Sequence, residues 1–384
     1  MQIDQPWLSA PETQAVFAAL TANGADAYVV GGCVRNALLG VPVSDIDIAT
    51  DATPETVLDL AKKAGIRAVP TGIEHGTVTL VEGGIPHEVT TFRKDVATDG
   101  RRAVVAFATD IAEDAARRDF TVNALYARPD GSIVDPLGGM PDLEARRIRF
   151  IGTAEDRIRE DYLRSLRYFR FHAWYGDQEA GFDPDALAAI ATNLDGLAQL
   201  SRERVGAEML KLLCAPDPAP AIAVMRQTGV LGQILPGAED RALAPLIHLE
   251  RQAGLGADAI RRLASLSGGA DLQDTLRLSK DQARKLERIH EAATGTMGAG
   301  ELGYRLGAEQ GRDALVLRAA LMEQPLAPDA IKGVEHGAAQ SFPVTAQDLM
   351  PDLTGAALGA ELKRLEAIWI ATGFCLDRAA LLSR

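Results

Sequence analysis

The chain has 384 residues, of which 47% are hydrophobic and 24% are charged, a composition that can fill sizeable cores and suggests two to four domains. The net charge of −13 argues against nucleic acid as a partner of the whole surface, although a local basic face can coexist with an acidic remainder. No apolar run reaches the roughly 18–20 residues of a membrane span, and the N-terminal MQIDQPWLSAPETQ lacks the pattern of a secretory signal. We therefore expect no membrane association.

Cysteine usage favours a reducing compartment. Cys33, Cys214 and Cys375 are far apart and odd in number, so they predict neither a disulfide framework nor a zinc site. We therefore predict a cytoplasmic protein, and the sequence gives no sign of an obligate protein partner.

The first 150 residues mix short β-rich runs with helical stretches, which predicts an α/β domain. The β-rich runs are AYVVGG, DIDIAT, GTVTLVE, HEVTTF and SIVDPL. From about residue 153 onward the strand signals end, and AEDRIREDYLRSLRYFRFHAWY and RERVGAEMLKLL have the apolar spacing of amphipathic helices. PDPAPA at 216–221 predicts a joint between helices. We therefore expect an α/β head followed by an all-helical remainder.

A glycine pair follows the first β-rich run. Gly31 and Gly32 come after AYVV and precede a helical stretch that contains Arg35. Glycine lets the backbone approach a ligand closely, and a helix N-terminus offers unpaired N–H groups to a phosphate. The pattern is consistent with a phosphate site, although most Gly-Gly pairs are simple turns.

Two aspartates stand one residue apart in the next apolar run. On a strand, Asp45 and Asp47 would point to the same face. Neighbouring carboxylates repel unless a proton or a cation lies between them, and magnesium takes one or two carboxylates together with substrate phosphates. An isolated Asp-x-Asp is more often an exposed edge strand with solvated side chains. Because this pair follows a phosphate-type glycine turn, we predict metal binding.

The stretch 160–171 combines a carboxylate with regularly spaced arginines. Asp161, Arg164, Arg167 and Arg170 step by three, so one helix would place them on one broad face. The alternative is an Asp–Arg pair beside solvated arginines, and such surface pairs contribute little. Three arginines that alternate with Leu, Tyr and Phe favour a bound anion instead.

These features belong to a longer series of motifs that resembles a known family. In chain order the motifs are GGCVRNALLG, SDIDIAT, PTGIEHGTVTL, HEVTTFR, ARRDFTVNAL, DPLGGMPDLEARRIRFIG, EDYLRSLRYFRF and SRERVGAEMLKLL. Over roughly the first 215 residues the chain resembles the bacterial class II tRNA nucleotidyltransferase and poly(A) polymerase family of the DNA polymerase β superfamily. The resemblance implies an α+β fold, with a nucleotidyltransferase head and its mixed sheet at 1–152, a helical neck at 153–215, and a helical, tRNA-binding body and tail at 216–384.

For the glycine turn and the aspartates, the resemblance implies specific roles. Gly32 and Arg35 would contact the nucleoside triphosphate, and Asp45 and Asp47 would hold Mg²⁺. Asn36 departs from the family, which usually has Asp after the arginine of GGxVRD, so a charge that could organise Arg35 is missing.

Three further head residues receive roles in the same way. Glu88 in HEVTTF resembles a third acidic residue that could assist deprotonation of the attacking 3′-hydroxyl, and a plain surface strand residue is the alternative. Arg118 in ARRDFTVNAL matches a nucleotide-binding arginine. Asp119 would organise the site or cap the next helix.

Two other features of the head are less specific. The segment 92–107, with Arg101 and Arg102, resembles the family's flexible loop beside the active site, but an ordinary solvated loop fits equally well. His75 and His172 do not have metal-ligand spacing, so we expect them to be structural or to line the substrate.

In the neck, the resemblance implies that Asp161 and Arg164 read the Watson–Crick edge of the incoming base, with Arg167 and Arg170 also binding the nucleotide. A carboxylate accepts from an amino group, and a guanidinium donates to ring nitrogens or carbonyl oxygens. Cytosine and adenine both carry an amino group beside a ring acceptor, whereas guanine and uracil present the opposite polarity. Protein side chains would then select the base without a template.

The implied reaction is Mg²⁺-dependent addition of C, C and A to the 3′ end of tRNA from CTP and ATP, with release of pyrophosphate. PTGIEHGT is similar to the CCA-adding branch, because poly(A) polymerases have a Gly-Arg-Arg/Lys-Phe-Arg type segment there. A poly(A) polymerase, or a partial enzyme that adds only CC or only A, stays an alternative. Asp45, Asp47 and Arg118 disfavour a silent RNA-binding protein, and the long helical C-terminal part disfavours a small-molecule acceptor.

One stretch of the C-terminal half, RLSKDQARKLERIH, is a candidate tRNA surface. Lys280, Arg284 and Arg288 recur every four residues, with Arg277 one turn earlier, so they would line one helical face. Such a stripe could follow tRNA phosphates without reading sequence. The alternative is a solvated helix whose arginines pair with neighbouring Asp and Glu side chains.

Overall fold

The computed structural model of the chain describes residues 1–99, 102–266 and 271–384, with the backbone alone for 95–99 and 102–105. The chain divides into two compact units. The first comprises residues 1–200 and 228–230, and the second comprises 201–227 and 231–384. The domain boundaries expected after residues 152 and 215 stay predictions.

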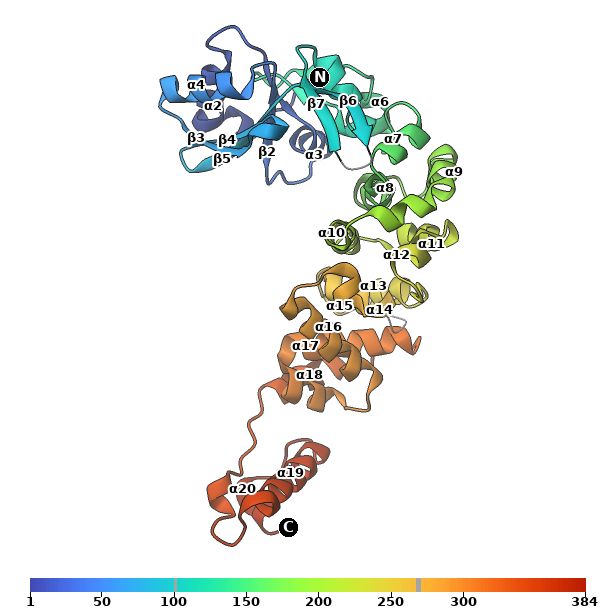
Figure 1. Ribbon diagram of the computed structural model, residues 1–384. Helices are drawn as coiled ribbons and strands as arrows, with labels where there is room; N and C mark the ends of the chain where they lie inside the picture. The colour runs from blue at the N-terminus through green and yellow to red at the C-terminus, as the bar shows by residue number, and fades with distance from the viewer. Residues whose placement is uncertain (100–101, 267–270) are drawn as a thin grey trace. The chain divides into compact units, whose positions relative to one another are not determined.

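A seven-stranded mixed sheet organises the first unit, in the order β3-β4-β5-β2-β1-β8-β9. Figure 1 labels its strands β2, β3, β4 and β5. Its strands are β1 Ala27–Val30, β2 Ile46–Thr50, β3 Arg67–Gly72, β4 Thr77–Glu82, β5 Ile85–Thr91, β8 Tyr126–Ala127 and β9 Ile133–Val134. β2 and β5 are parallel, and the other neighbours are antiparallel. The predicted mixed sheet is confirmed, and five of these strands lie in or overlap the five β-rich runs of the sequence.

The two faces of this sheet differ in polarity. Val78, Leu80 and Val89 are buried, on the face that packs against α2 Pro11–Thr21 and α4 Pro54–Ala64 (Figure 1). Because side chains alternate along a strand, Asp47 of β2 and Glu88 of β5 belong to the opposite face, where they are cross-strand neighbours.

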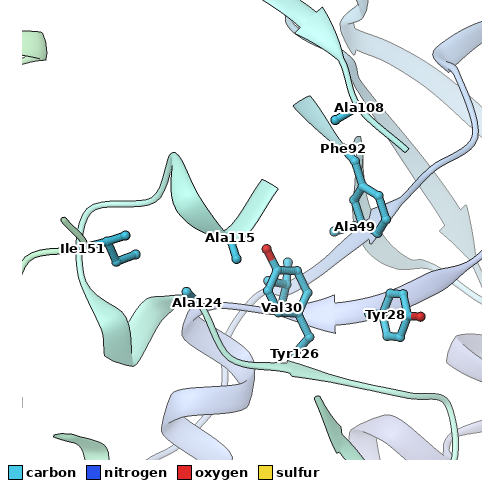
Figure 2. Close-up of a cluster of buried hydrophobic side chains, with 9 residues drawn as sticks. All are labelled: Tyr28, Val30, Ala49, Phe92, Ala108, Ala115, Ala124, Tyr126 and Ile151. Atoms are coloured by element: carbon cyan, nitrogen blue, oxygen red, sulfur yellow. The ribbon is translucent and has the colours of Figure 1, made fainter. Parts of the chain in front are cut away.

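A cluster of buried side chains supports this second face (Figure 2). Tyr28 stacks on Phe92 with ring centroids 6.2 Å apart and meets Tyr126 edge to face at 6.3 Å. The other members are Val30, Ala49, Ala108, Ala115, Ala124 and Ile151. Ala49 stands two residues after Asp47 on the same strand, so this packing fixes the strand that carries the Asp47 carboxylate.

The segment 92–107 is an antiparallel ribbon over most of its length instead of a loop. β6 Arg93–Asp99 pairs with β7 Arg102–Phe107. The run AVVAF has the β-branched and aromatic residues that favour a strand, a signal to which the loop prediction gave too little weight. Arg101 lies outside the described residues, as does the side chain of Arg102.

Helices and short 3₁₀ segments complete the first unit. Besides α2 and α4 they are α1 Pro6–Ser9, α3 Gly32–Leu39, α5 Ile111–Ala116, α6 Met140–Glu144, α7 Ala154–Glu160, α8 Leu163–Tyr175, α9 Pro184–Thr192, η1 Ile73–His75, η2 Thr121–Asn123 and η3 Leu194–Gln199. The stretch predicted as one helix breaks at Asp161, whose backbone is extended with φ −155° and ψ 105°. The Asp161 carboxylate accepts the Leu163 N–H at 3.1 Å and so caps the start of α8. The prediction that Asp161 shares a helical face with the arginines was therefore wrong.

Beyond residue 200 the described chain is helical, which confirms the predicted all-helical remainder. The helices are α10 Arg202–Leu213, α11 Ala219–Gln227, α12 Val230–Ile234, α13 Leu243–Gln252, α14 Ala259–Leu266, α15 Leu272–Leu276, α16 Lys280–Thr294, α17 Ala299–Leu321, α18 Ala330–Ala338, η4 Ala346–Asp348, α19 Gly355–Ala371 and α20 Arg378–Leu382. Within the described ranges, none of the helices combines the length and apolar character needed to cross a membrane.

The second unit contains a buried ion cluster, formed by Glu250, Arg261, Arg262, Lys285 and Asp313. Arg261 donates to Glu250 Oε1 at 2.8 Å and to Asp313 Oδ1 at 2.5 Å. Arg262 Nη2 donates to Glu250 Oε2 at 2.8 Å, and Lys285 Nζ lies 3.3 Å from Asp313 Oδ2. Each of these charges therefore has a partner of opposite sign within hydrogen-bond or ion-pair distance.

Candidate active site

The glycine turn between β1 and α3 brings a helix N-terminus beside an arginine. Gly31 has φ 73° and ψ −119°, a conformation that favours glycine. A Cβ at Gly31 would lie 3.3 Å from Nη1 of Arg118. α3 begins at the next residue, Gly32, so the predicted strand–turn–helix arrangement is present and has a guanidinium next to it.

Three carboxylates meet at β2 and β5. Asp45 is exposed and precedes β2 instead of lying in it, and Ser44 Oγ donates to its Oδ2 at 2.8 Å. Asp47 is half-buried, and exposed Glu88 is its partner in the parallel register. Burial, and after it the Glu88 and Asp45 carboxylates, raises the pKa of Asp47 to about 6, whereas Arg118 lowers it. The structure thus brings together Asp45, Asp47 and Glu88, as the sequence predicted.

Arg118 is held in place by two buried groups. Its Nη2 donates to Asp114 Oδ2 at 3.0 Å and its Nε donates to Tyr126 Oη at 3.1 Å. The Tyr126 hydroxyl donates in turn to Asp114 Oδ2 at 2.7 Å. Although burial lowers it, Tyr126 and Asp114 raise the pKa of Arg118 above its ordinary value. A permanently charged guanidinium therefore stands between the glycine turn and Asp47.

A second network, the Arg35 network, consists of Arg35, Asn36, Asn123 and Tyr175. The Arg35 side chain is buried, its Nη1 donates to Asn123 Oδ1 at 2.5 Å, and its Nη2 donates to Asn36 Oδ1 at 2.8 Å and to Tyr175 Oη at 2.9 Å. The guanidinium also lies 3.9 Å from the centre of the Tyr175 ring. Asn36 thus supplies an acceptor without the expected carboxylate, and the network ties α3 to η2 and α8. Contact between Arg35 and a triphosphate stays a prediction.

Asp119 links this network to the arginines of α8. Its Oδ1 accepts from Asn123 Nδ2 at 2.8 Å and its Oδ2 accepts from Arg167 Nε at 2.8 Å. The guanidinium groups of Arg167 and Arg170 lie 5.3 Å and 4.5 Å from the centre of the Phe171 ring. Asp119 therefore joins the Arg35 network to Arg167, and its role in organising the active site stays a prediction.

Arg164 is positioned at the start of α8 by groups on three sides. Its Nη1 donates to the Glu160 carboxylate and, at 3.0 Å, to the Arg157 carbonyl oxygen. Its Nη2 donates to the Arg117 carbonyl oxygen at 3.4 Å. Glu160, the residue before Asp161, therefore pairs with Arg164, while the Asp161 carboxylate caps α8 beside it.

The carboxylates at β2 and β5 fit a magnesium ion that also binds substrate. No group of three or more His, Cys, Asp or Glu side chains in the described parts of the chain is arranged to hold a metal by itself. Magnesium needs only one or two carboxylates when phosphates supply further ligands. The pKa of Asp47 is raised chiefly by burial and also by the Glu88 and Asp45 carboxylates, and a bound cation would oppose both effects. Asp45 and Asp47 are therefore suitable ligands.

Among the described residues, neither His75 nor His172 belongs to a group of side chains that could hold a metal. His172 is buried, stacks on Phe182 with ring centroids 3.6 Å apart, and has Nε2 2.9 Å from the Gly181 carbonyl oxygen. His75 is exposed in η1, 3.7 Å from Glu74. His172 is therefore structural, which is one of the two roles that we expected for it.

The predicted tRNA stripe lies on one helix, α16. Lys280, Arg284 and Arg288 are exposed, and Leu286 on the same helix is buried. Arg284 lies 3.4 Å from Asp281, so one of the pairs expected in the alternative is present. Arg277 does not continue the stripe, because it ends α15 with φ 50° and pairs with Asp274 at 2.6 Å.

Two family models match separate parts of the chain. The model described as "Poly A polymerase head domain" matches residues 27–149, and the one described as "Probable RNA and SrmB- binding site of polymerase A" matches 181–241. The mitochondrial CCA tRNA nucleotidyltransferase 1 of Mus musculus is 33% identical over 371 residues, which cover 92% of this chain and 85% of the mouse protein. The chain belongs to the CCA tRNA nucleotidyltransferase family.

Further members of the family agree with this assignment. The crystal structure of the Bacillus stearothermophilus CCA-adding enzyme in complex with CTP matches with a TM-score of 0.78 and 30% identity, over 96% of this chain and 93% of that one. The human mitochondrial enzyme is 43% identical over 215 residues, and this match spans 54% of the chain and 50% of the human protein. The predicted resemblance, fold and nucleotidyltransferase class are confirmed.

Four polar side chains that shape the site of this family member were missed in the sequence: Asp114, Asn123, Tyr126 and Tyr175. Asp114 stands four residues before Arg118, so helical spacing could have indicated their pairing. Asn123 and Tyr175 lie 88 and 140 residues from Arg35, and no local pattern connects them.

Proposed function

We propose that the chain adds C, C and A in turn to the 3′ end of tRNA, from CTP and ATP, in a Mg²⁺-dependent transfer that releases pyrophosphate. The observation that carries the proposal is the Asp47–Glu88 pair on adjacent parallel strands, with the pKa of Asp47 raised to about 6 by burial, Glu88 and Asp45. Such a crowded carboxylate site beside a helix N-terminus and Arg118 suits a divalent cation with a triphosphate. The CTP complex of the bacterial relative supports this substrate class.

Each residue of the head then has a distinct task. Asp45 and Asp47 hold Mg²⁺, which when bound neutralises charge on the transferred and leaving phosphate oxygens. Glu88, exposed beside Asp47, takes the proton of the attacking 3′-hydroxyl. Arg118 and the N–H groups that begin α3 at Gly32 bind the triphosphate, because both present fixed donors to anionic oxygens.

The start of α8 selects the base. Glu160 and two carbonyl oxygens hold the Arg164 guanidinium, and Asp161 is fixed next to it by its cap on Leu163. A fixed acceptor and a fixed donor suit the edges of cytosine and adenine. Asp161→Ala should therefore relax discrimination against UTP and GTP by roughly 1–3 kcal/mol, by analogy with base readout. If the variant is slower but equally selective, Asp161 and Arg164 have a structural role and do not read the base.

The acceptor is tRNA, and α16 contributes part of its binding surface. Lys280, Arg284 and Arg288 are exposed along α16 despite the chain's net charge of −13. Such a stripe suits phosphates and carries no sequence preference. A cytoplasmic location stays a prediction, and three of the similar animal proteins are named as mitochondrial.

One transfer assay decides between full CCA addition and its alternatives. Purified protein is incubated with Mg²⁺ and either tRNA that ends before CCA or tRNA that ends in CC, with single labelled nucleotides. A CCA-adding enzyme transfers C to the first RNA and A to the second. Transfer of C alone or of A alone would identify a partial enzyme, and long A tracts would identify a poly(A) polymerase.

A further inference from the structure

We infer that Tyr162 and Gly196 are positioning residues for base selection. The Tyr162 ring rests on the backbone of Gly196 and thereby holds Asp161 and the first turn of α8 in place. Neither Tyr162 nor Gly196 has to touch the nucleotide. The inference rests on the proposed function, because it extends the selection of the base by Asp161 and Arg164.

Tyr162 lies at the break between two helices. Asp161 and Tyr162 stand between the end of α7 and the start of α8. The Tyr162 carbonyl oxygen accepts the Ser165 N–H at 3.1 Å, and the Asp161 carbonyl oxygen accepts the Arg164 N–H at 2.9 Å. A displacement of Tyr162 is therefore passed on to the first turn of α8, which carries the Arg164 side chain.

The Tyr162 ring lies directly against Gly196. A Cβ at Gly196 would lie 2.0 Å from both Cδ1 and Cε1 of Tyr162 and 2.3 Å from its Cζ. Because carbon atoms that are not bonded to each other pack at about 3.5–4.0 Å, even an alanine at this position would displace the ring by about 1 Å or more. The close approach of the ring therefore requires glycine at position 196.

The segment that carries Gly196, η3, is fixed to its neighbours. The Gly196 N–H donates to the Asn193 carbonyl oxygen at 3.2 Å. Asn193 Nδ2 donates to the Ala189 carbonyl oxygen at 2.8 Å, which ties the start of η3 to α9. Leu197, the residue after Gly196, is buried. The Tyr162 ring thus rests on a support that is anchored on α9 and in the core.

The position of the Asp161 carboxylate depends on this support more than that of the Arg164 guanidinium does. Asp161 has an extended backbone, and its carboxylate accepts the Leu163 N–H at 3.1 Å. Arg164 is held separately, by Glu160 and two carbonyl oxygens. A shift of Tyr162 therefore moves the acceptor relative to the donor. In a preorganised site, a misplacement of about 1 Å can cost roughly 10²-fold.

The test compares the affinity for CTP with the affinity for UTP, measured by calorimetric titration of the full chain with Mg²⁺ and without tRNA. Gly196→Ala and Tyr162→Ala should each lower the ratio of the two affinities at least about fivefold, because the acceptor and the donor no longer match the edge of cytosine. The double variant should be no less selective than Tyr162→Ala, since both changes disturb one contact. Tyr162→Phe should keep the wild-type ratio, because it retains the ring carbons that approach Gly196.

Gly206→Ala is the matched control for a steric clash away from the base. A Cβ at Gly206, on α10 of the second unit, would lie 1.9 Å from the Leu276 carbonyl oxygen. This variant should lower the unfolding temperature and leave the ratio of CTP to UTP affinity unchanged. An unchanged ratio in Gly196→Ala or in Tyr162→Ala overturns the positioning role, as does a loss of selectivity in Gly206→Ala.

Asp161→Ala and the transfer assay keep this inference distinct from the proposed function. If Asp161→Ala relaxes the selection of CTP while Gly196→Ala and Tyr162→Ala do not, the proposed base selection stands and the positioning role falls. If Gly196→Ala and Tyr162→Ala both lose selectivity but wild type transfers no nucleotide to tRNA, the positioning role stands and the proposed transfer falls.

Discussion

The carboxylates at β2 and the buried ion cluster of the second unit differ in whether their neighbours stabilise the charged form of the side chains. In the buried ion cluster, Glu250 lies between Arg261 and Arg262. Although burial lowers it, Glu250 and Asp313 raise the pKa of Arg261. At β2, burial and two other carboxylates raise the pKa of Asp47. The surroundings therefore favour the charged form of Arg261 in the buried ion cluster, whereas at β2 they disfavour the charged form of Asp47.

The difference separates structural charge from functional charge. A buried charge that its own chain neutralises fixes the positions of helices, and breaking the pair leaves an uncompensated charge. A carboxylate opposed by like charge is poised for a proton or a cation from solution. By this criterion the buried ion cluster of the second unit needs no ligand, whereas Asp47 is the carboxylate for which we propose a cation.

The largest expected effect tests the functional charge. Asp47→Asn should lower nucleotidyl transfer by roughly 10²-fold or more, because the loss of a metal ligand forfeits several kcal/mol of transition-state stabilisation. Transfer of labelled C to tRNA, per mole of folded protein, is the measurement. Asp59→Asn, an exposed carboxylate on α4, is the control and should keep full activity. Substantial Mg²⁺-dependent transfer by Asp47→Asn would remove Asp47 from the active site.

The next effect tests the structural charge. Glu250→Leu leaves Arg261 and Arg262 without their shared carboxylate, so the free energy of unfolding of the second unit should fall by roughly 3–5 kcal/mol. Urea unfolding measures this decrease. Glu309→Gln, with a side chain 79% exposed, should cost less than about 1 kcal/mol. A mild effect of Glu250→Leu would mean that the buried ion cluster contributes little, and the contrast with Asp47 would weaken.

The Arg35 network is an intermediate case, because a cation there is buried among neutral acceptors. Tyr175→Phe removes the hydroxyl that accepts from Arg35 Nη2, and the KM for CTP should rise roughly 10-fold, about 1.4 kcal/mol, as α8 loses its tie to α3. Tyr168→Phe is a matched control on α8, since its hydroxyl accepts from Asp183 N–H at 2.9 Å. Both variants should lose some stability. Equal CTP affinity in the two would reduce the network to a stabilising contact.

These cases also show what the sequence could and could not predict. Gly31, Asp47, Glu88 and Arg118 stand in short motifs, so their meeting was predictable. The break at Asp161 was not, because the apolar spacing runs on through it and the cap overrides the periodicity.

Long-range contacts and short strands also could not be predicted from the sequence. The partners of Arg35 come from segments far along the chain, where no local pattern connects them. β3 and β8 were missed for a similar reason. β3 Arg67–Gly72 has no buried residue and β8 has two residues, so neither gives a clear alternation.

The smallest effect concerns charges that are exposed. Replacing Lys280, Arg284 and Arg288 of α16 together by alanine should flatten the slope of log tRNA affinity against log salt by roughly 0.7–0.9 for each phosphate that the variant no longer neutralises. The triple variant should bind CTP normally, because the head is untouched. Binding of labelled tRNA at several salt concentrations measures the slope. An unchanged slope and affinity would place the tRNA on another surface.

The unfolding free energy of wild type relative to Asp47→Asn, measured at pH 4 and pH 7.5 with and without Mg²⁺, tests the central claim most directly. The pKa of folded Asp47 is raised from 3.8 to about 6. Protonation of Asp47 therefore stabilises the folded protein fully below about pH 4, and this stabilisation is lost as the pH rises through 6. Without Mg²⁺, wild type should therefore lose up to roughly 3 kcal/mol relative to Asp47→Asn between these pH values. Mg²⁺ should restore part of that stability at pH 7.5 in wild type alone. A difference that responds to neither pH nor Mg²⁺ would contradict the claim that the head holds an opposed carboxylate for a cation.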